Sequence, residues 1–111
     1  MRFLLLLYGD EAAEDALTPA ERRAIVDEHI AFSRQLHEAG KLVLGEPLGP
    51  SHQGRIVSKR GVTDGPFAET KEQLGGVYVI EAGSLDEAIG IAQRVPEGPG
   101  LVVEVRAIPE M

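Results

Sequence analysis

His29 and Asp64 are the two residues of this 111-residue chain whose types and positions best suit proton transfer. His29 lies in a segment whose apolar residues recur at helical spacing, with Phe32 and Leu36 in the same stripe. An imidazole on a core-facing stripe must find a hydrogen-bond partner, and the surrounding pocket sets its pKa. Spacing alone leaves two interpretations open: a general acid or base, or a structural histidine satisfied within the core.

Asp64 begins a conformationally restricted turn, Asp64-Gly65-Pro66-Phe67. Asp-Gly permits a positive φ, proline fixes its own φ near about −65°, and Phe67 could anchor the turn in the core. A rigid turn would aim the Asp64 carboxylate at a fixed point, where it could orient an imidazole and stabilise its charged form. If the turn packs near the helix, we predict that His29 carries a proton and that Asp64 orients it. Ordinary turn chemistry remains the alternative.

The other polar candidates are weaker. His37 follows His29 by eight residues, which is not the one-turn spacing that presents two imidazoles to one ion, so no metal site is expected from these histidines and Asp64. His52 lies in a loop of Ser, Gly and Gln and is expected to be solvated. Three further side chains could add polar groups to a pocket, although packing or surface positions are favoured for them: Tyr8, Glu69 and Tyr78.

Composition excludes several classes of function. The chain has no cysteine, so it has no disulfide framework, thiolate nucleophile or sulfur-based zinc site. Its formal net charge of −7 opposes binding to phosphate backbones and anionic lipids, so neither nucleic acid nor a membrane is expected as a direct partner. Gly75-Gly76 precedes an apolar run and does not open a helix, which argues against a phosphate loop, and no cofactor is expected.

The length of the chain suits one hydrophobic core, so residues 1–111 are expected to form a single domain. The first apolar run, residues 3–8, is far shorter than the roughly 18 residues of a membrane span. No small-residue cleavage site follows it, as it would in a signal peptide. We therefore predict a cytoplasmic protein.

Capping residues at two places in the sequence indicate the starts of two helices. Residues 18–21 combine a hydroxyl N-cap, proline at the first helical position and a capping-box glutamate, which predicts a helix to about Ala39. Residues 84–87 repeat the capping box and predict a second helix, ended by Pro96. The acidic segment 10–15 has no clear period and is expected to be a surface loop.

Apolar runs indicate the strands of one sheet. Residues 2–8 and 77–82 are apolar on both faces, which is typical of central strands, whereas residues 101–108 alternate and predict one solvated face. A short strand is expected at residues 41–45. Residues 55–59 and 62–64 predict a small hairpin, whose basic residues are interpreted as a solvated surface.

The resulting order predicts an α+β, ferredoxin-like βαββαβ domain with an inserted hairpin, in which residues 2–8 and 77–82 lie side by side. Two helices cover only one face of such a sheet. Either Leu4 and Leu6, or alternatively Phe3, Leu5 and Leu7, would then remain on an uncovered apolar face. A second copy in a symmetric dimer is the simplest cover. The alternative is a monomer whose hairpin folds over that face.

Three segments resemble the DGPF branch of the YCII-related proteins: the run DGPFAETKEQLGGVYVIEAGSLDEA, the opening FLLLLYGDE and the helix end HEAGKLVLGEPL. The resemblance spans nearly the whole chain. It implies a small bacterial domain of ferredoxin-like fold that pairs as a dimeric α/β barrel and has no assigned function. Enzymatic activity was suggested for the wider family from a recurrent histidine and aspartate, and one class of relatives acts in dehalogenation of chlorinated hydroquinones.

The resemblance transfers the family histidine to His29 but does not transfer the aspartate. The family aspartate belongs to an Asp-Pro pair after the second helix, where this chain has Val95-Pro96. Either Asp64 replaces it or the pair is lost. The main hypothesis is therefore a homodimer that binds a small molecule and carries out acid-base chemistry. The rival is a non-catalytic ligand-sensing or interaction module with a regulatory protein partner, suggested by fusion of some DGPF members to sigma-factor domains.

Overall fold

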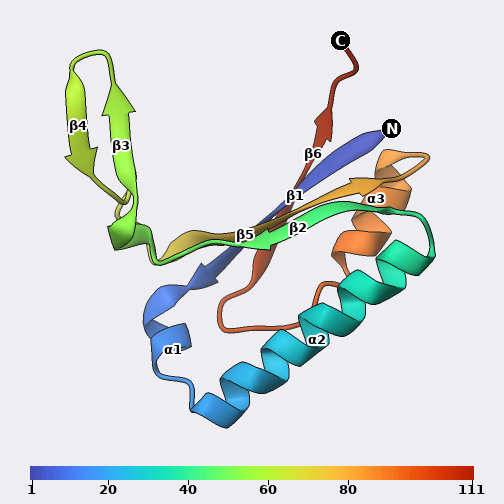
Figure 1. Ribbon diagram of the computed structural model, residues 1–111, viewed down its shortest axis with the longest axis horizontal. Coiled ribbons are helices and arrows are strands. Elements are labelled where there is room, and N and C mark those ends of the chain that lie inside the picture. Colours follow the sequence, from blue (N-terminus) through green and yellow to red (C-terminus); the bar gives the residue numbers. More distant parts are fainter.

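The computed structural model describes residues 1–111 and contains a four-stranded antiparallel sheet (Figure 1). Strand β1 (Arg2–Asp10) lies between β5 (Glu72–Glu81) and β6 (Val102–Ile108), and β2 (Leu42–Pro47) pairs with the far edge of β5. The order β2-β5-β1-β6 is consistent with a ferredoxin-like α+β fold. The predicted pairing of the two strands that are apolar on both faces is confirmed.

The long helix α2 (Pro19–Glu38) begins at the predicted capping box. The Glu21 amide donates to Thr18 Oγ1 at 3.1 Å, and the Thr18 amide donates to the Glu21 carboxylate at 2.9 Å. Beyond the helix, Gly40 adopts φ 71°, a conformation that glycine reaches without strain. None of the three helices is both long enough and apolar enough to cross a membrane.

Three boundaries differ from the sequence expectations. The segment expected to be a loop contains the short helix α1 (Glu11–Asp15), because the Asp10 side chain caps it by accepting from the Ala13 amide at 3.2 Å. Strand β5 begins at Glu72, before the apolar run, since cross-strand pairing with β1 continues through its polar first residues. Helix α3 (Leu85–Ala92) ends before Pro96, and a hydrogen-bonded turn follows it.

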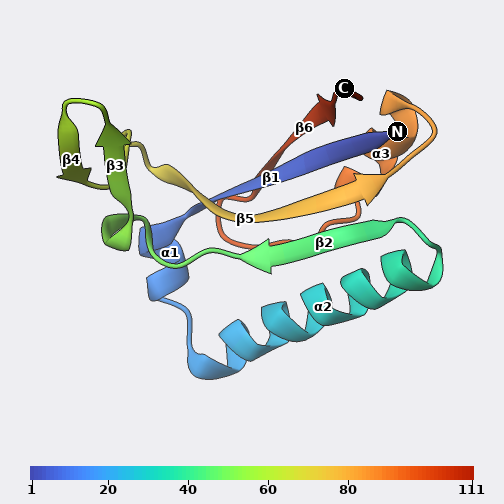
Figure 2. The ribbon, with the colours of Figure 1, turned by 45° about the horizontal axis from the view of Figure 1, so that its top comes forward.

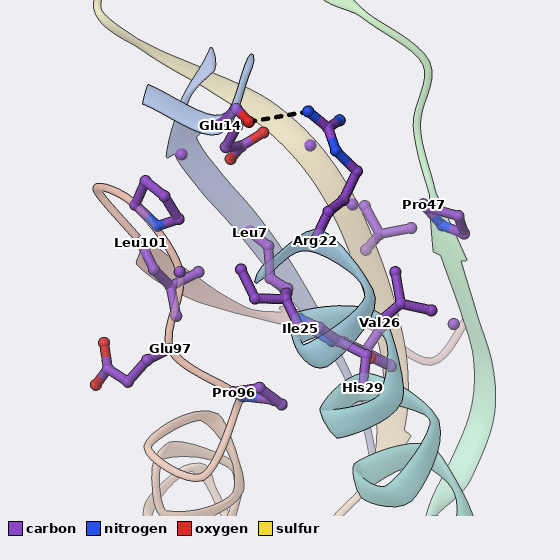
Figure 3. A pocket seen from close by; sticks show the side chains of 18 of the residues that line it. Leu7, Glu14, Arg22, Ile25, Val26, His29, Pro47, Pro96, Glu97 and Leu101 are labelled. Atoms are coloured by element: carbon purple, nitrogen blue, oxygen red, sulfur yellow. Dashed lines mark hydrogen bonds between the residues drawn. The ribbon is translucent and has the colours of Figure 1, made fainter. Parts of the chain in front are cut away.

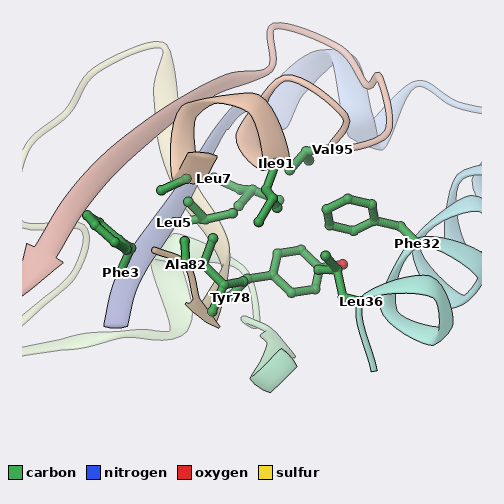
Figure 4. Close-up of a cluster of buried hydrophobic side chains, with 11 residues drawn as sticks. Phe3, Leu5, Leu7, Phe32, Leu36, Tyr78, Ala82, Ile91 and Val95 are labelled. Atoms are coloured by element: carbon green, nitrogen blue, oxygen red, sulfur yellow. The ribbon is translucent and has the colours of Figure 1, made fainter. Parts of the chain in front are cut away.

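The two longer helices pack on the same face of the sheet and form the hydrophobic core there (Figure 4). Phe3, Leu5 and Leu7 of β1 point into this core because alternate residues of a strand share a face. They meet Phe32 and Leu36 of α2. Other buried members come from β5, α3 and the turn after it: Tyr78, Ile80, Ala82, Ala88, Ile91 and Val95.

The opposite face of the sheet, here called the outer face, is apolar but uncovered. Leu4 lies opposite Val79 and Leu6 opposite Val77 across the β1–β5 ladder, and Leu44 of β2 joins them opposite Val79. Residues opposite one another in a ladder share a face, so these five side chains form one surface. It is the Leu4 and Leu6 set, not the Phe3, Leu5 and Leu7 set, that remains uncovered.

The predicted hairpin is present but does not cover the outer face. Strands β3 (Arg55–Ser58) and β4 (Gly61–Asp64) pair only with each other, in a separate two-stranded sheet. In both views this hairpin extends from the end of the main sheet and points away from α2 (Figures 1 and 2). The alternative in which the hairpin of a monomer folds over the uncovered sheet is therefore wrong.

Candidate functional site

A cavity of about 640 Å³ lies between α2 and one end of the sheet (Figure 3). Its walls come from α1 and α2, from the C-terminal parts of β1 and β2, from the middle of β5, and from the loop at residues 96–99 that leads to β6. Most of the lining is aliphatic or glycine, including Leu7, Ile25, Val26 and Leu101. This volume and lining are typical of a site for a small organic ligand.

The most polar contact in the cavity joins His29 of α2 to Tyr78 of β5. The His29 Nδ1 atom lies 2.7 Å from the Tyr78 hydroxyl, and the two rings are stacked with an interplanar angle of 10°. Phe32 packs edge-on against Tyr78 at a centroid distance of 5.3 Å. Tyr78 is only 6% exposed, so both its ring and its hydroxyl are held in place by packing. The pair thus fixes the orientation of the imidazole.

Gly45 of β2 makes room for this arrangement. It lies opposite Tyr78 in the ladder, and a Cβ atom at this position would approach the tyrosine ring to 2.6 Å. Carbon atoms pack at about 3.5–4.0 Å, so any larger residue would displace the ring. Gly45 therefore allows Tyr78 to lie across the edge strand and to reach His29.

The second ring nitrogen of His29 is free. Nε2 has no hydrogen-bond partner within the protein, and no buried side-chain nitrogen or oxygen in the chain lacks a partner. Nε2 must therefore be accessible from the cavity. Burial lowers the pKa of His29, while the carboxylate of Glu28 opposes the shift. The lowered pKa favours the neutral imidazole at neutral pH.

A neutral His29 can present either a proton or a lone pair to a ligand. When the Tyr78 hydroxyl donates to Nδ1, Nε2 carries the proton; when Nδ1 donates to the tyrosine oxygen, Nε2 carries the lone pair. Burial raises the pKa of Tyr78, against the effect of the Ser33 side chain, so the phenol stays protonated and can take either role. The geometry thus suits both general acid and general base chemistry.

Two charged residues lie at another part of the cavity wall (Figure 3). Arg22 of α2 donates from Nη2 to the backbone oxygen of Glu14 at 3.1 Å, and no carboxylate lies within ion-pair distance of its guanidinium. Burial, followed by the neighbouring carboxylates, raises the pKa of Glu14. Arg22 therefore has hydrogen-bond donors left for a ligand.

The structure does not bring Asp64 to His29 within one chain. Asp64 ends strand β4 of the projecting hairpin, its side chain is 86% exposed, and Oδ1 lies 3.5 Å from Arg55 Nε. It does not line the cavity. The turn after it is also not anchored in the core, since Phe67 is 85% exposed. The predicted packing of this turn over the helix is wrong for a single chain, because the hairpin leads away from α2.

The remaining candidates lie outside the cavity or at its edge. His37 and His52 are exposed, and so is Glu69. Tyr8 lines the cavity in part, but its hydroxyl donates to Glu104 on the neighbouring strand at 3.1 Å. No group of three or more His, Asp or Glu side chains is placed to hold a metal ion.

Sequence reasoning underrated Tyr78, for which it favoured a packing position. The available signal was the alternation in β5, which places Tyr78 on the same face as Ile80 and Ala82. A tyrosine on a buried face needs a partner for its hydroxyl, and a histidine was expected on the facing stripe of α2. No comparable signal in the sequence indicated that Arg22 lines the cavity, because its position depends on its hydrogen bond to the backbone of α1.

Two comparisons with known proteins bear on the chain. A family described as the YCII-related domain matches residues 1–111. An uncharacterised protein of Rhizobium meliloti (strain 1021) is 38% identical over 97 residues, which cover 84% of this chain and 78% of that protein. Neither result names a substrate.

Proposed function

The chain belongs to the family of the YCII-related domain, and we propose that it binds a small molecule beside His29 and transfers a proton through His29 Nε2. The observation that carries the proposal is the contact of 2.7 Å between His29 Nδ1 and the Tyr78 hydroxyl. It leaves the other ring nitrogen open to the cavity. A desolvated, oriented imidazole in a cleft is what general acid-base catalysis requires.

The lining of the cavity limits the class of ligand. Aliphatic walls favour a compact ligand with an apolar body. Beside Nε2 of His29 that ligand needs either a hydrogen that it can give up or an atom that can accept a proton. The unused donors of Arg22 favour a hydrogen-bond acceptor elsewhere on the ligand. Tyr78 acts here as a positioning residue, since its hydroxyl is already engaged by His29.

The test is a fragment screen by NMR on protein labelled with ¹⁵N in its histidines. We expect a subset of apolar fragments with one polar group to shift the Nε2 resonance of His29. The same fragments should lose at least about tenfold in affinity for His29→Gln. His37→Gln, on the exposed face of the same helix, is the matched control and should bind them as the wild type does. Equal binding to His29→Gln would contradict the proposal.

Proton transfer is tested separately from binding. A bound compound with an exchangeable carbon-bound hydrogen should take up deuterium from D₂O in the presence of wild-type protein and not of His29→Gln, as measured by mass spectrometry. If compounds bind beside His29 but none takes up deuterium or is converted, the rival function is favoured. That rival is a ligand-sensing module that acts through a regulatory protein.

We also propose how the chain assembles and to which branch of the family it belongs. The uncovered outer face supports a homodimer in which two sheets pack face to face as a dimeric α/β barrel, since an apolar face of a sheet needs a cover. The sequence Asp64-Gly65-Pro66-Phe67 supports membership of the DGPF branch.

A further inference from the structure

The hairpin β3–β4 is the least buried part of the molecule. Within residues 55–64, here called the arm, only Ile56 is partly buried. Val57 and Val62 lie opposite one another in the hairpin, yet they are 71% and 62% exposed. Phe67, just after the arm, is exposed as well. An isolated two-stranded hairpin is marginally stable in water, so an arm with an exposed apolar pair is expected to need a partner surface.

The base of the arm is nevertheless fixed. The Ser51 amide donates to Glu11 Oε2 at 2.9 Å, and the Ser51 hydroxyl bonds to the other oxygen of the same carboxylate. The Gly65 amide donates to the Gly54 carbonyl at 2.9 Å, and a Cβ atom on Gly65 would approach the Ser51 carbonyl oxygen to 2.8 Å. A tight base directs the arm before any partner is met, which lowers the entropy lost on docking.

The charge of the arm differs from that of the rest of the chain. The arm holds Arg55, Lys59 and Arg60 against one carboxylate, Asp64, so its net charge is +2. The whole chain carries −7, and the residues outside the arm therefore carry −9. A basic arm and an acidic body attract each other between two copies of this chain.

We propose that the arm of one copy clasps the body of a second copy, with the Val57–Val62 pair packed on it and the basic tip facing its acidic surface. This inference rests on the proposed dimer but is separate from the pairing of outer faces. The arm is inserted in the chain between β2 and β5, the two strands that carry part of the outer face, and extends from an end of the main sheet, so its connections reach the region of the outer-face pairing (Figure 1). It also points away from α2, whose side of the sheet holds the core (Figure 2).

The experiment compares dimer dissociation constants by analytical ultracentrifugation. The double variant Val57→Ser with Val62→Ser removes only exposed apolar groups, so it should fold normally. We expect it to raise the dissociation constant at least about tenfold. A second variant, Lys59→Glu with Arg60→Glu, should raise it by a similar factor. Leu85→Ser is the matched control, because Leu85 is 51% exposed on α3, outside both the arm and the outer face.

The outcomes separate the arm from the outer face. Arm amides should be protected from hydrogen exchange in the dimer and unprotected in a Leu6→Lys monomer. A wild-type dimer whose dissociation constant is unchanged in both arm variants would overturn the clasp and leave the outer-face pairing intact. Protection that arises only on addition of another protein or a nucleic acid would also overturn it. A wild type that is monomeric at all concentrations would overturn the clasp together with the dimer.

Discussion

The two faces of the main sheet have similar side chains and different surroundings. Leu5 and Leu6 are neighbours in β1, but Leu5 is 0% exposed under the helices and Leu6 is partly open on the outer face. Both faces are apolar at the centre of the sheet. The difference shows that one chain completes only one of two hydrophobic layers. The completed layer can hold a cleft for chemistry, and the incomplete layer is available for assembly.

The covered face is complete except at one end. Beyond Phe32 the stripe of α2 continues through His29 and Ile25, which line the cavity and are only partly buried. On the strands, Gly9, Gly45 and Gly76 border that space and provide no side chains to fill it. The cleft therefore exists because β1, β2 and β5 have glycine where α2 passes over them, so that no side chain fills the space between helix and sheet.

The largest effect is expected from a substitution that disrupts the core under the covered face. Leu5→Ala removes a fully buried side chain and should lower the free energy of unfolding by about 2–5 kcal/mol. Chemical denaturation monitored by circular dichroism measures this value. A loss below about 1 kcal/mol would mean that the covered face is not the core.

The second largest effect is expected on dimer formation, from a substitution of the adjacent residue, Leu6, on the outer face. Leu6→Lys places a charge at its centre, and we expect the dimer dissociation constant to rise at least about 100-fold while the fold persists. Light scattering gives the mass, and circular dichroism verifies the secondary structure. Were the Leu6→Lys chain to unfold as Leu5→Ala does at every concentration, the two faces would not differ as described.

A smaller effect tests the fit between Gly45 and Tyr78. Gly45→Ala should cost about 1–3 kcal/mol of stability by forcing the tyrosine ring away, and it should weaken fragment binding beside His29. Gly90→Ala is the control, because its added Cβ in α3 would meet no side chain and no other element within 4 Å. That control should raise the free energy of unfolding by about 0.5–1 kcal/mol. Equal thermal denaturation midpoints for the two variants would argue against the close contact at Gly45.

Tyr78→Phe sharpens the comparison between the observed partner of His29, which is Tyr78, and the predicted partner, which is Asp64. It removes the hydroxyl that holds His29 and should cost about 1 kcal/mol of stability and about tenfold in fragment affinity. Asp64→Asn should change neither quantity, since Asp64 is exposed and paired with Arg55. Isothermal titration of both variants with the same fragment distinguishes them. A larger loss for Asp64→Asn would restore the aspartate as the partner of His29.

The smallest effect is the dependence of stability on pH. Burial lowers the pKa of His29 in the folded state below the value near 6.5 of an unfolded chain, against the effect of Glu28. Between these two values the unfolded state binds more protons, so the free energy of unfolding falls as the pH drops below about 6.5. Denaturation at pH 7.5 and 5.5 should show a smaller fall for His29→Gln than for the wild type. Identical falls would place His29 in a solvated position.

The sequence predicted those features that depend on local signals. The capping box at residues 18–21, the glycine after α2 and the alternation in β1 each have a local physical cause, so the elements and their order were predicted. Helix α1 was missed because five residues are too few to show a period. The direction of the hairpin was not predictable, since it depends on contacts at its base such as that between Ser51 and Glu11. His29 was placed correctly on the core stripe of α2, but its partner Tyr78 lies 49 residues further along the chain, on strand β5.

The most direct test of the difference between the two faces is the mass of the wild-type protein in solution. Light scattering at micromolar concentration should give twice the chain mass of 11.9 kDa. The methyl groups of Leu4 and Leu6 should also be as inaccessible to a soluble paramagnetic probe as those of Leu5. A mass of 11.9 kDa, with the outer face accessible to solvent, would contradict the account.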